Sequence, residues 1–151
     1  GIRDFCLSRG LGDVYKRQVC RKAHFNAAHR LYKKEWDEKK NEKIFGKCSN
    51  PFYHGHNYEI IVSITGEIDP QTGYVMDMKK LKDLIKIHVE DYFDHKNMNE
   101  QLPEFFELIP TAENIVVVIW NKLRNVIDRK MRISITLFET PRNYVIYDGD
   151  S

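Results

Sequence analysis

The sequence predicts an α+β fold with a mainly antiparallel sheet and both helices on one face of that sheet. Apolar residues alternate with polar ones in four segments, two in the N-terminal half of the chain and two close to its C-terminus. Two segments between them carry apolar residues at helical spacing instead. The order strand-strand-helix-helix-strand-strand contains no strand-helix-strand repeat, the unit of parallel sheets. With 151 residues, the chain is long enough for one domain with its own core.

The first strand is predicted from Val19 to His29. Residues 1–18 show neither a two-residue nor a helical apolar period, so we interpret them as a foreign or disordered leader. From Val19 onward, apolar or small residues recur at every second position, as in a strand. The domain is therefore assigned to residues 19–151.

A charged segment and a second strand follow. Residues 33–43 are crowded with lysine and glutamate, which indicates a solvated loop or a short surface helix. Residues 57–68 again alternate and predict a strand. Residues 69–73 have turn chemistry, because Pro70 fixes φ and Gly73 admits a positive φ. We expect a strand pair around this turn.

Two helices and two strands complete the domain. Asp77 is a suitable N-cap for a helix that ends near residues 94–97, and Thr111 for a helix over 112–127. Alternation predicts final strands over 132–139 and 143–147. The apolar stripe of the first helix consists of Met78, Leu81, Leu84, Ile85, His88, Val89 and Tyr92, and that of the second of Ile115, Ile119, Leu123 and Val126.

Composition excludes several classes of protein. The chain has 24 basic and 22 acidic residues, and the excess lies within residues 1–18, so the domain offers no basic surface for nucleic acid. The longest apolar run, Ile115–Trp120, is too short for a membrane span. Three cysteines without paired spacing predict a reducing compartment, and we expect a cytoplasmic protein.

Three histidines form the strongest chemical signal. His54 and His56 alternate around Gly55, so their rings share one face if the segment is extended. His29, at the end of the preceding strand, can supply a third imidazole. Three nitrogen ligands leave one tetrahedral position of Zn²⁺ open, as in catalytic zinc sites. The sequence therefore predicts a zinc site, although an isolated His-x-His is often structural.

Cys48, Asp94 and His95 are candidate proton-transfer groups. Cys48 lies in a polar loop, where Lys47 and a nearby cation would favour the thiolate, although a lone cysteine is more often a small buried hydrophobe. Asp94 can orient the imidazole of His95, which ends the first helix and can equally serve as a dipole complement.

Two carboxylates are candidate ligand-binding groups. Glu113 lies in the first turn after Thr111, where an acidic residue is also expected for capping alone. Glu139 lies on the same face of the predicted strand as the preceding apolar residues, at the rim of the core. There it can accept two hydrogen bonds from a planar ring edge such as that of a pterin, or simply begin the turn.

The chain resembles the 6-pyruvoyl-tetrahydropterin synthase family over residues 19–147. The combination of motifs is specific, although each motif alone is not. They are FNAAHRL (25–31), GKCSNPFYHGHNY (46–58), GEIDPQTGYVMD (66–77), FDHKN (93–97), PTAEN (110–114) and FET (138–140).

This resemblance implies the tunnelling fold: a four-stranded antiparallel sheet with two helices, assembled into trimeric barrels and usually hexamers, with active sites between subunits. It implies zinc on His29, His54 and His56 and a substrate, 7,8-dihydroneopterin triphosphate, that loses triphosphate. Cys48 would accept the proton, tuned by Asp94 and His95. Glu139 would anchor the pterin, helped by Thr111 and Glu113.

Two products remain open within the family: 6-pyruvoyl-tetrahydropterin on the biopterin route, or 6-carboxy-tetrahydropterin with acetaldehyde on the queuosine route. The interval from Cys48 to His54 is similar to that of the pyruvoyl-forming branch. A related glycolaldehyde-releasing aldolase typically has glutamate at the position of Cys48. A zinc-stabilised binding or assembly protein would keep the histidines but have no use for Cys48 or the Asp94–His95 pair.

Overall fold

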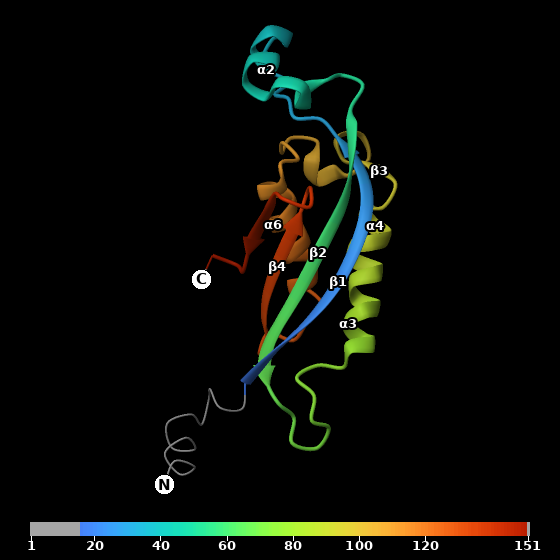
Figure 1. Cartoon of the computed structure of the whole chain (residues 1–151), viewed down its shortest axis with the longest axis vertical. Coiled ribbons are helices and arrows are strands. Elements are labelled where there is room, and N and C mark those ends of the chain that lie inside the picture. The colour runs from blue at the N-terminus through green and yellow to red at the C-terminus, as the bar shows by residue number, and fades with distance from the viewer. Residues whose placement is uncertain (1–15, 151) are drawn as a thin grey trace.

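The computed structural model describes residues 16–150 and shows one sheet with helices packed against it (Figure 1). The sheet has the order β3-β1-β2-β4-β5. Its strands are β1 (Lys16–His29), β2 (His54–Glu67), β3 (Lys96–Asn97), β4 (Arg132–Phe138) and β5 (Tyr144–Tyr147). The helices are α2 (Glu38–Phe45), α3 (Met78–Ile85), α4 (Asp91–Phe93), α5 (Met98–Gln101) and α6 (Ala112–Arg124), with short turns η1 (Gly46–Ser49), η2 (Lys86–Glu90) and η3 (Pro103–Phe105).

Strands β1 and β2 form the long antiparallel pair on which the domain is built. Their register runs from Lys16 opposite Glu67 to His29 opposite His54. Both strands begin three residues before the predicted positions. The prediction missed residues 16–18 and 54–56 because they show no alternation of apolar and polar residues. The end of β1 at His29 is confirmed. The predicted leader lies mostly within residues 1–15, which are outside the described part of the chain.

The predicted four-stranded antiparallel sheet is wrong, since the sheet has five strands and is mixed. The additional strand, β3, pairs in parallel with Ala27 and Ala28 of β1. It follows His95, whose positive φ of 60° turns the chain towards β1. The backbone N–H of His95 donates to the carbonyl of Asn26 at 2.6 Å. A strand of two residues has no period, so alternation could not predict it.

The strand pair expected around residues 69–73 is also wrong. The turn itself is present, because Gly73 N–H donates to the carbonyl of Asp69 at 2.7 Å. However, Asp77 already caps α3 by accepting a hydrogen bond from Lys79 N–H at 2.9 Å. The few residues between turn and cap bury Val75 and Met76 in the core instead of forming a strand.

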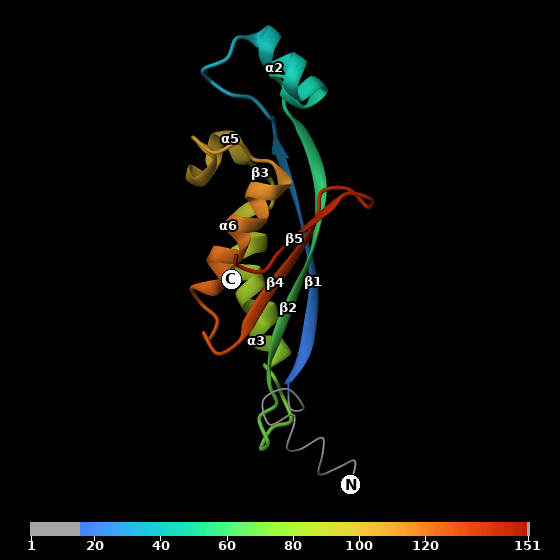
Figure 2. The ribbon, with the colours of Figure 1, turned by 90° about the vertical axis from the view of Figure 1, so that its left-hand side faces the viewer.

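Both main helices cover the same face of the sheet, as predicted (Figure 2). The first predicted helix is α3, continued by the π-helical turn η2 and by α4 to Phe93. The second, α6, ends at Arg124, three residues early, where the guanidinium of Arg124 binds the carbonyls of Ile127, Asp128 and Met131. Among the described residues, no helix is both long and apolar enough to cross a membrane.

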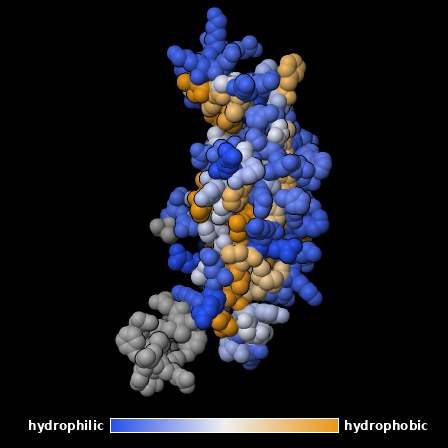
Figure 3. Space-filling view, viewed as in Figure 1, coloured by the Kyte–Doolittle hydropathy of each residue, from blue (hydrophilic) through white to orange (hydrophobic). Residues whose placement is uncertain are grey.

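The charged segment forms helix α2 at the end of the molecule. Asp37 caps it by accepting a hydrogen bond from Lys40 N–H at 2.8 Å. Helix α2 and turn η1 connect β1 to β2 beyond the end where the histidines lie (Figure 1). Figure 3 shows a hydrophilic tip at this end of the molecule, with apolar residues below it.

Candidate metal centre and active site

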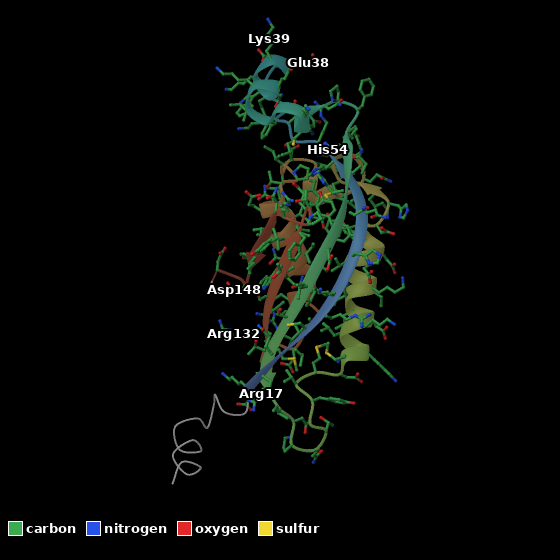
Figure 4. The ribbon with its side chains drawn as sticks, in the orientation of Figure 1. Arg17, Glu38, Lys39, His54, Arg132 and Asp148 are labelled. Atoms are coloured by element: carbon green, nitrogen blue, oxygen red, sulfur yellow. The ribbon has the colours of Figure 1, made fainter. Side chains whose placement is uncertain are left out.

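Strand pairing brings the three histidines together. His29 lies opposite His54, and Ala27 lies opposite His56, so all three imidazoles project from the same face of the β1–β2 pair. His54 marks this position at the α2 end of β2 (Figure 4). The ring centroids are 4.6 to 5.0 Å apart. One ligand nitrogen from each ring lies within 4.8 Å of the others, so small side-chain rotations allow one cation to contact all three.

A hydrogen bond fixes the tautomer of His29. Its ring is almost fully buried, and Nδ1 lies 2.8 Å from the carbonyl oxygen of Pro110. Because a carbonyl only accepts, Nδ1 carries the proton and donates it. Nε2 therefore keeps its lone pair. A carbonyl behind the distal nitrogen is the usual support of a histidine that binds a metal.

The histidines are held in the neutral form that a metal requires. Burial lowers the pKa of His29 from its ordinary value near 6.5 to about 4. Burial also lowers the pKa of His54 and that of His56. At neutral pH, proton competition for these nitrogens is therefore weak.

The residues present fit a zinc ion. Within residues 16–150, no fourth cysteine, histidine or carboxylate joins the three-histidine group. Nδ1 of His54 is buried and has no hydrogen-bond partner in the described part of the chain, and such a nitrogen is the kind of group that a metal satisfies. Three neutral nitrogens with space for an exogenous ligand correspond to a catalytic rather than a structural site.

Glu139 lies at the edge of the histidine group. Its Oε2 is 3.9 Å from Nε2 of His29, but because that imidazole is neutral at pH 7, the contact is not an ion pair. Burial raises the pKa of Glu139, and the charge of Glu113 adds to this effect. The carboxylate is only about a quarter exposed and is available to a ligand beside the metal centre.

The N-terminus of α6 borders the same site. Thr111 caps this helix by accepting a hydrogen bond from Asn114 N–H at 3.2 Å, as the sequence predicted. The preceding residue, Pro110, supplies the carbonyl that holds His29. Glu113 is exposed in the first turn and interacts electrostatically with Glu139. The predicted ligand-binding residues Thr111, Glu113 and Glu139 therefore belong to one region.

Cys48 lies in turn η1, beyond the strand ends. Its side chain is half-buried, and its carbonyl accepts a hydrogen bond from Leu31 N–H at 2.7 Å. This bond ties the turn to the residue two positions after His29. Cys48 does not belong to the metal-ligand group.

Asp94 and His95 form the predicted pair at the opposite edge of β1. Asp94 Oδ2 lies 2.8 Å from His95 Nδ1, and Oδ1 accepts the backbone N–H of Asn26 at 2.8 Å. This backbone hydrogen bond, more than the adjacent histidine, lowers the pKa of Asp94. The His95 side chain is 79% exposed, and within residues 16–150 neither member of the pair bonds to Cys48.

Two supporting groups escaped the sequence analysis. The Pro110 carbonyl lies in a loop far from the histidines in sequence, and no sequence signal could have placed it. The buried hydroxyl of Tyr58, 3.4 Å from His29 Nδ1, follows His56 by two positions. Strand alternation places it on the histidine face, so that contact could have been predicted.

Fold and site define a small α+β protein in which three histidines from two adjacent strands could hold one metal ion. Residues 18–150 match the family model described as 6-pyruvoyl tetrahydropterin synthase. The chain is 42% identical to the 6-pyruvoyl tetrahydrobiopterin synthase of Pongo abelii (93% of this chain, 97% of that protein) and 40% identical to that of Homo sapiens (95% and 99%). The Caenorhabditis elegans 6-pyruvoyl tetrahydropterin synthase structure superposes with a TM-score of 0.84 at 34% identity, covering 89% of this chain and 96% of that one.

The chain therefore belongs to the 6-pyruvoyl tetrahydropterin synthase family of lyases. This finding confirms the family that the sequence motifs indicated.

Proposed function

We propose that this chain is a zinc-dependent lyase that converts 7,8-dihydroneopterin triphosphate into 6-pyruvoyl-tetrahydropterin with loss of triphosphate. The observation that carries the proposal is the neutral three-histidine group beside the half-buried carboxylate of Glu139. This arrangement offers a metal site with an open position and a ring anchor next to it. The names of the relatives at 40–42% identity agree with this activity.

Glu139 anchors the pterin ring. An ionised carboxylate accepts two parallel hydrogen bonds from a planar N–C–N edge, which fixes the plane and direction of the ring. Burial raises the pKa of Glu139 because water solvates its charge incompletely. Hydrogen bonds from a ligand to this carboxylate therefore stabilise the complex more than bonds to a fully solvated carboxylate would. Thr111 and Glu113 border the ring at the start of α6.

Cys48 removes a proton from the substrate side chain. Zinc held by His29, His54 and His56 would polarise the side-chain hydroxyls and acidify the neighbouring C–H bonds. The Cys48 thiolate takes that proton as a general base. Turn η1 holds the thiol near the end of β1 through the bond from Leu31 to the Cys48 carbonyl.

The Asp94–His95 pair acts on Cys48 of a neighbouring subunit. In the described part of a single chain, the pair is exposed and makes no bond to the thiol. Within residues 16–150, β3 covers the outer edge of β1 at Ala27 and Ala28 alone, and β5 is the last strand on the other side. Exposed strand edges favour association of copies through their sheets. A homo-oligomer, trimeric or hexameric, would bring the pair to the thiol.

The decisive experiment measures both products of the zinc-loaded protein with 7,8-dihydroneopterin triphosphate. Triphosphate release without acetaldehyde supports the proposal. Acetaldehyde would assign the 6-carboxy-tetrahydropterin branch instead. An absence of turnover with zinc bound would identify a non-catalytic, zinc-stabilised protein.

A further inference from the structure

The charged segment after β1 lines an open cavity next to the candidate active site. The cavity has a volume of about 770 Å³ and lies between the chain following β1, helix α2 and turn η1. Its lining contains four cationic side chains and two carboxylates, so it is positive overall. The cations are Arg30, Lys33, Lys34 and Lys47, and the carboxylates are Glu38 and Glu42.

Residues adjacent in sequence to Cys48 and to His29 line this cavity. Lys47 and Ser49, on either side of Cys48, line it. Arg30, which follows the metal ligand His29, lines it as well. A group bound in the cavity would therefore lie against turn η1, the turn that carries Cys48.

One wall of the cavity is organised by Asn41, which is only 5% exposed. Its Oδ1 accepts the backbone N–H of Lys33 at 2.7 Å, and its Nδ2 donates to the Lys33 carbonyl at 3.0 Å. Nδ2 also lies within hydrogen-bond distance of the carbonyls of Trp36 and Asp37. The backbone that carries the Lys33 ammonium is thus fixed before any ligand binds.

A second part of the lining, turn η1, is held by Arg30. Its guanidinium donates two hydrogen bonds to the carbonyl of Ser49, at 2.7 and 3.1 Å, and lies 3.9 Å from the centre of the Tyr32 ring. The Asn99 side chain in turn binds both the backbone N–H and the carbonyl of Arg30. Turn η1 is therefore tied to the chain that follows β1.

Two of the lining cations lack a carboxylate partner in the described part of the chain, and one of them, the ammonium of Lys33, lies 5.2 Å from the centre of the Trp36 ring. Lys34 lies 3.9 Å from Glu107, but within residues 16–150 neither Lys33 nor Lys47 has a carboxylate within 4.0 Å. Two ammonium groups on separate, hydrogen-bonded segments of one cavity lining suit a polyanion rather than a neutral ligand.

We propose that this cavity binds the polyphosphate chain of the substrate and holds it as it leaves. This inference rests on the proposed function, in which the bond to triphosphate breaks on the same short side chain that Cys48 deprotonates. Lys33 and Lys47 neutralise the leaving group, and Arg30 and Asn41 hold the two parts of the lining in place. The charged segment, which the metal site does not use, thus determines the preference for a phosphorylated substrate.

The test uses calorimetric binding of magnesium tripolyphosphate to the zinc-loaded full chain. The magnesium complex limits removal of zinc, and zinc content is measured before and after. The double variant K33Q/K47Q should weaken binding by at least about tenfold, because each charge-assisted contact to phosphate contributes that order of affinity. The matched control is K39Q/K43Q, which removes two charges from α2 outside the cavity lining. Lys39 lies at the far end of α2 in Figure 4.

The control variant should bind tripolyphosphate like the unaltered chain. Equal loss in both variants would overturn the proposal by showing that only overall charge matters, and so would unchanged binding by K33Q/K47Q. If K33Q/K47Q keeps its tripolyphosphate affinity while the chain still releases triphosphate from the substrate, the subsite fails and the proposed function survives. If the chain has no turnover but its tripolyphosphate binding depends on Lys33 and Lys47, the proposed function fails and the anion site remains.

Discussion

The histidine group and the proposed proton-transfer groups, Cys48, Asp94 and His95, are positioned in different ways. The three imidazoles project from long paired strands, are partly or fully buried, and meet within one chain. Cys48 lies in a short turn, and the Asp94–His95 pair lies at an exposed edge on the other side of β1. Strand register brings the candidate metal ligands together within one chain, whereas the proposed proton relay requires a second subunit.

This difference separates binding from catalysis. A monomer with correctly paired strands should bind zinc, because all three ligands and the Pro110 carbonyl belong to it. Turnover should additionally require assembly, because no contact joins Cys48 to His95 within residues 16–150. The predictions below test each side of this comparison.

Removal of a metal ligand should have the largest effect. We expect His56→Ala to lower zinc affinity by more than about 100-fold and to reduce turnover to background, since the loss of a direct ligand exceeds that of a supporting residue. Zinc content after dialysis against a weak chelator measures this. His24→Ala is the matched control, because His24 is exposed on the other face of β1. Full zinc retention by His56→Ala would contradict the three-ligand site.

Cys48→Ala should retain zinc and lose turnover by about 10² to 10⁴-fold, the usual contribution of a general base. Unchanged triphosphate release would refute the role of Cys48 as proton acceptor. His95→Ala should behave similarly. Oligomers assembled from Cys48→Ala and His95→Ala chains should recover part of the activity, because some interfaces then contain both intact groups. No recovery in verified mixed oligomers would place the relay within a single chain.

Glu139→Gln should weaken binding of a pterin analogue by about tenfold or more, since it replaces two charge-assisted hydrogen bonds with one neutral acceptor. Zinc binding should change little, because Glu139 is not a member of the ligand group. Calorimetry with the analogue and zinc analysis test the two parts separately. Unaffected analogue binding would remove the ring anchor from the mechanism.

A further prediction is a pH dependence of the stability of the metal-free protein. Burial lowers the pKa of His29 to about 4, whereas in the unfolded chain it is near 6.5. Between these values the unfolded state binds more protons, so stability rises with pH across this interval and is lost as the pH falls through it. The slope from His29 should reach ~1.4 kcal/mol per pH unit. Urea unfolding of the chelator-treated protein measures it, and a flat profile would contradict the buried neutral histidine.

Sequence alone predicted those elements in which a strand or helix period extends over many residues. The alternation of β1 and β2 gave the face on which His29, His54 and His56 lie, and helical spacing gave α3 and α6. The two-residue β3 was missed, because pairing with β1 depends on the turn at His95 rather than on a pattern.

The candidate site was predictable where neighbours in sequence or register are neighbours in space. Asp94 and His95 are adjacent, so their hydrogen bond could be expected. The position of the Pro110 carbonyl behind His29 could not, because it depends on how the loop before α6 packs. The location of Cys48 relative to His95 depends on assembly, for which the periodic pattern of one chain carries no signal.

X-ray absorption at the zinc edge of the purified protein tests the central claim most directly. We predict three imidazole nitrogens at about 2.0–2.1 Å, with a light-atom ligand in the remaining position. A sulfur neighbour at about 2.3 Å would show that Cys48 is a ligand rather than a base, and would contradict the account.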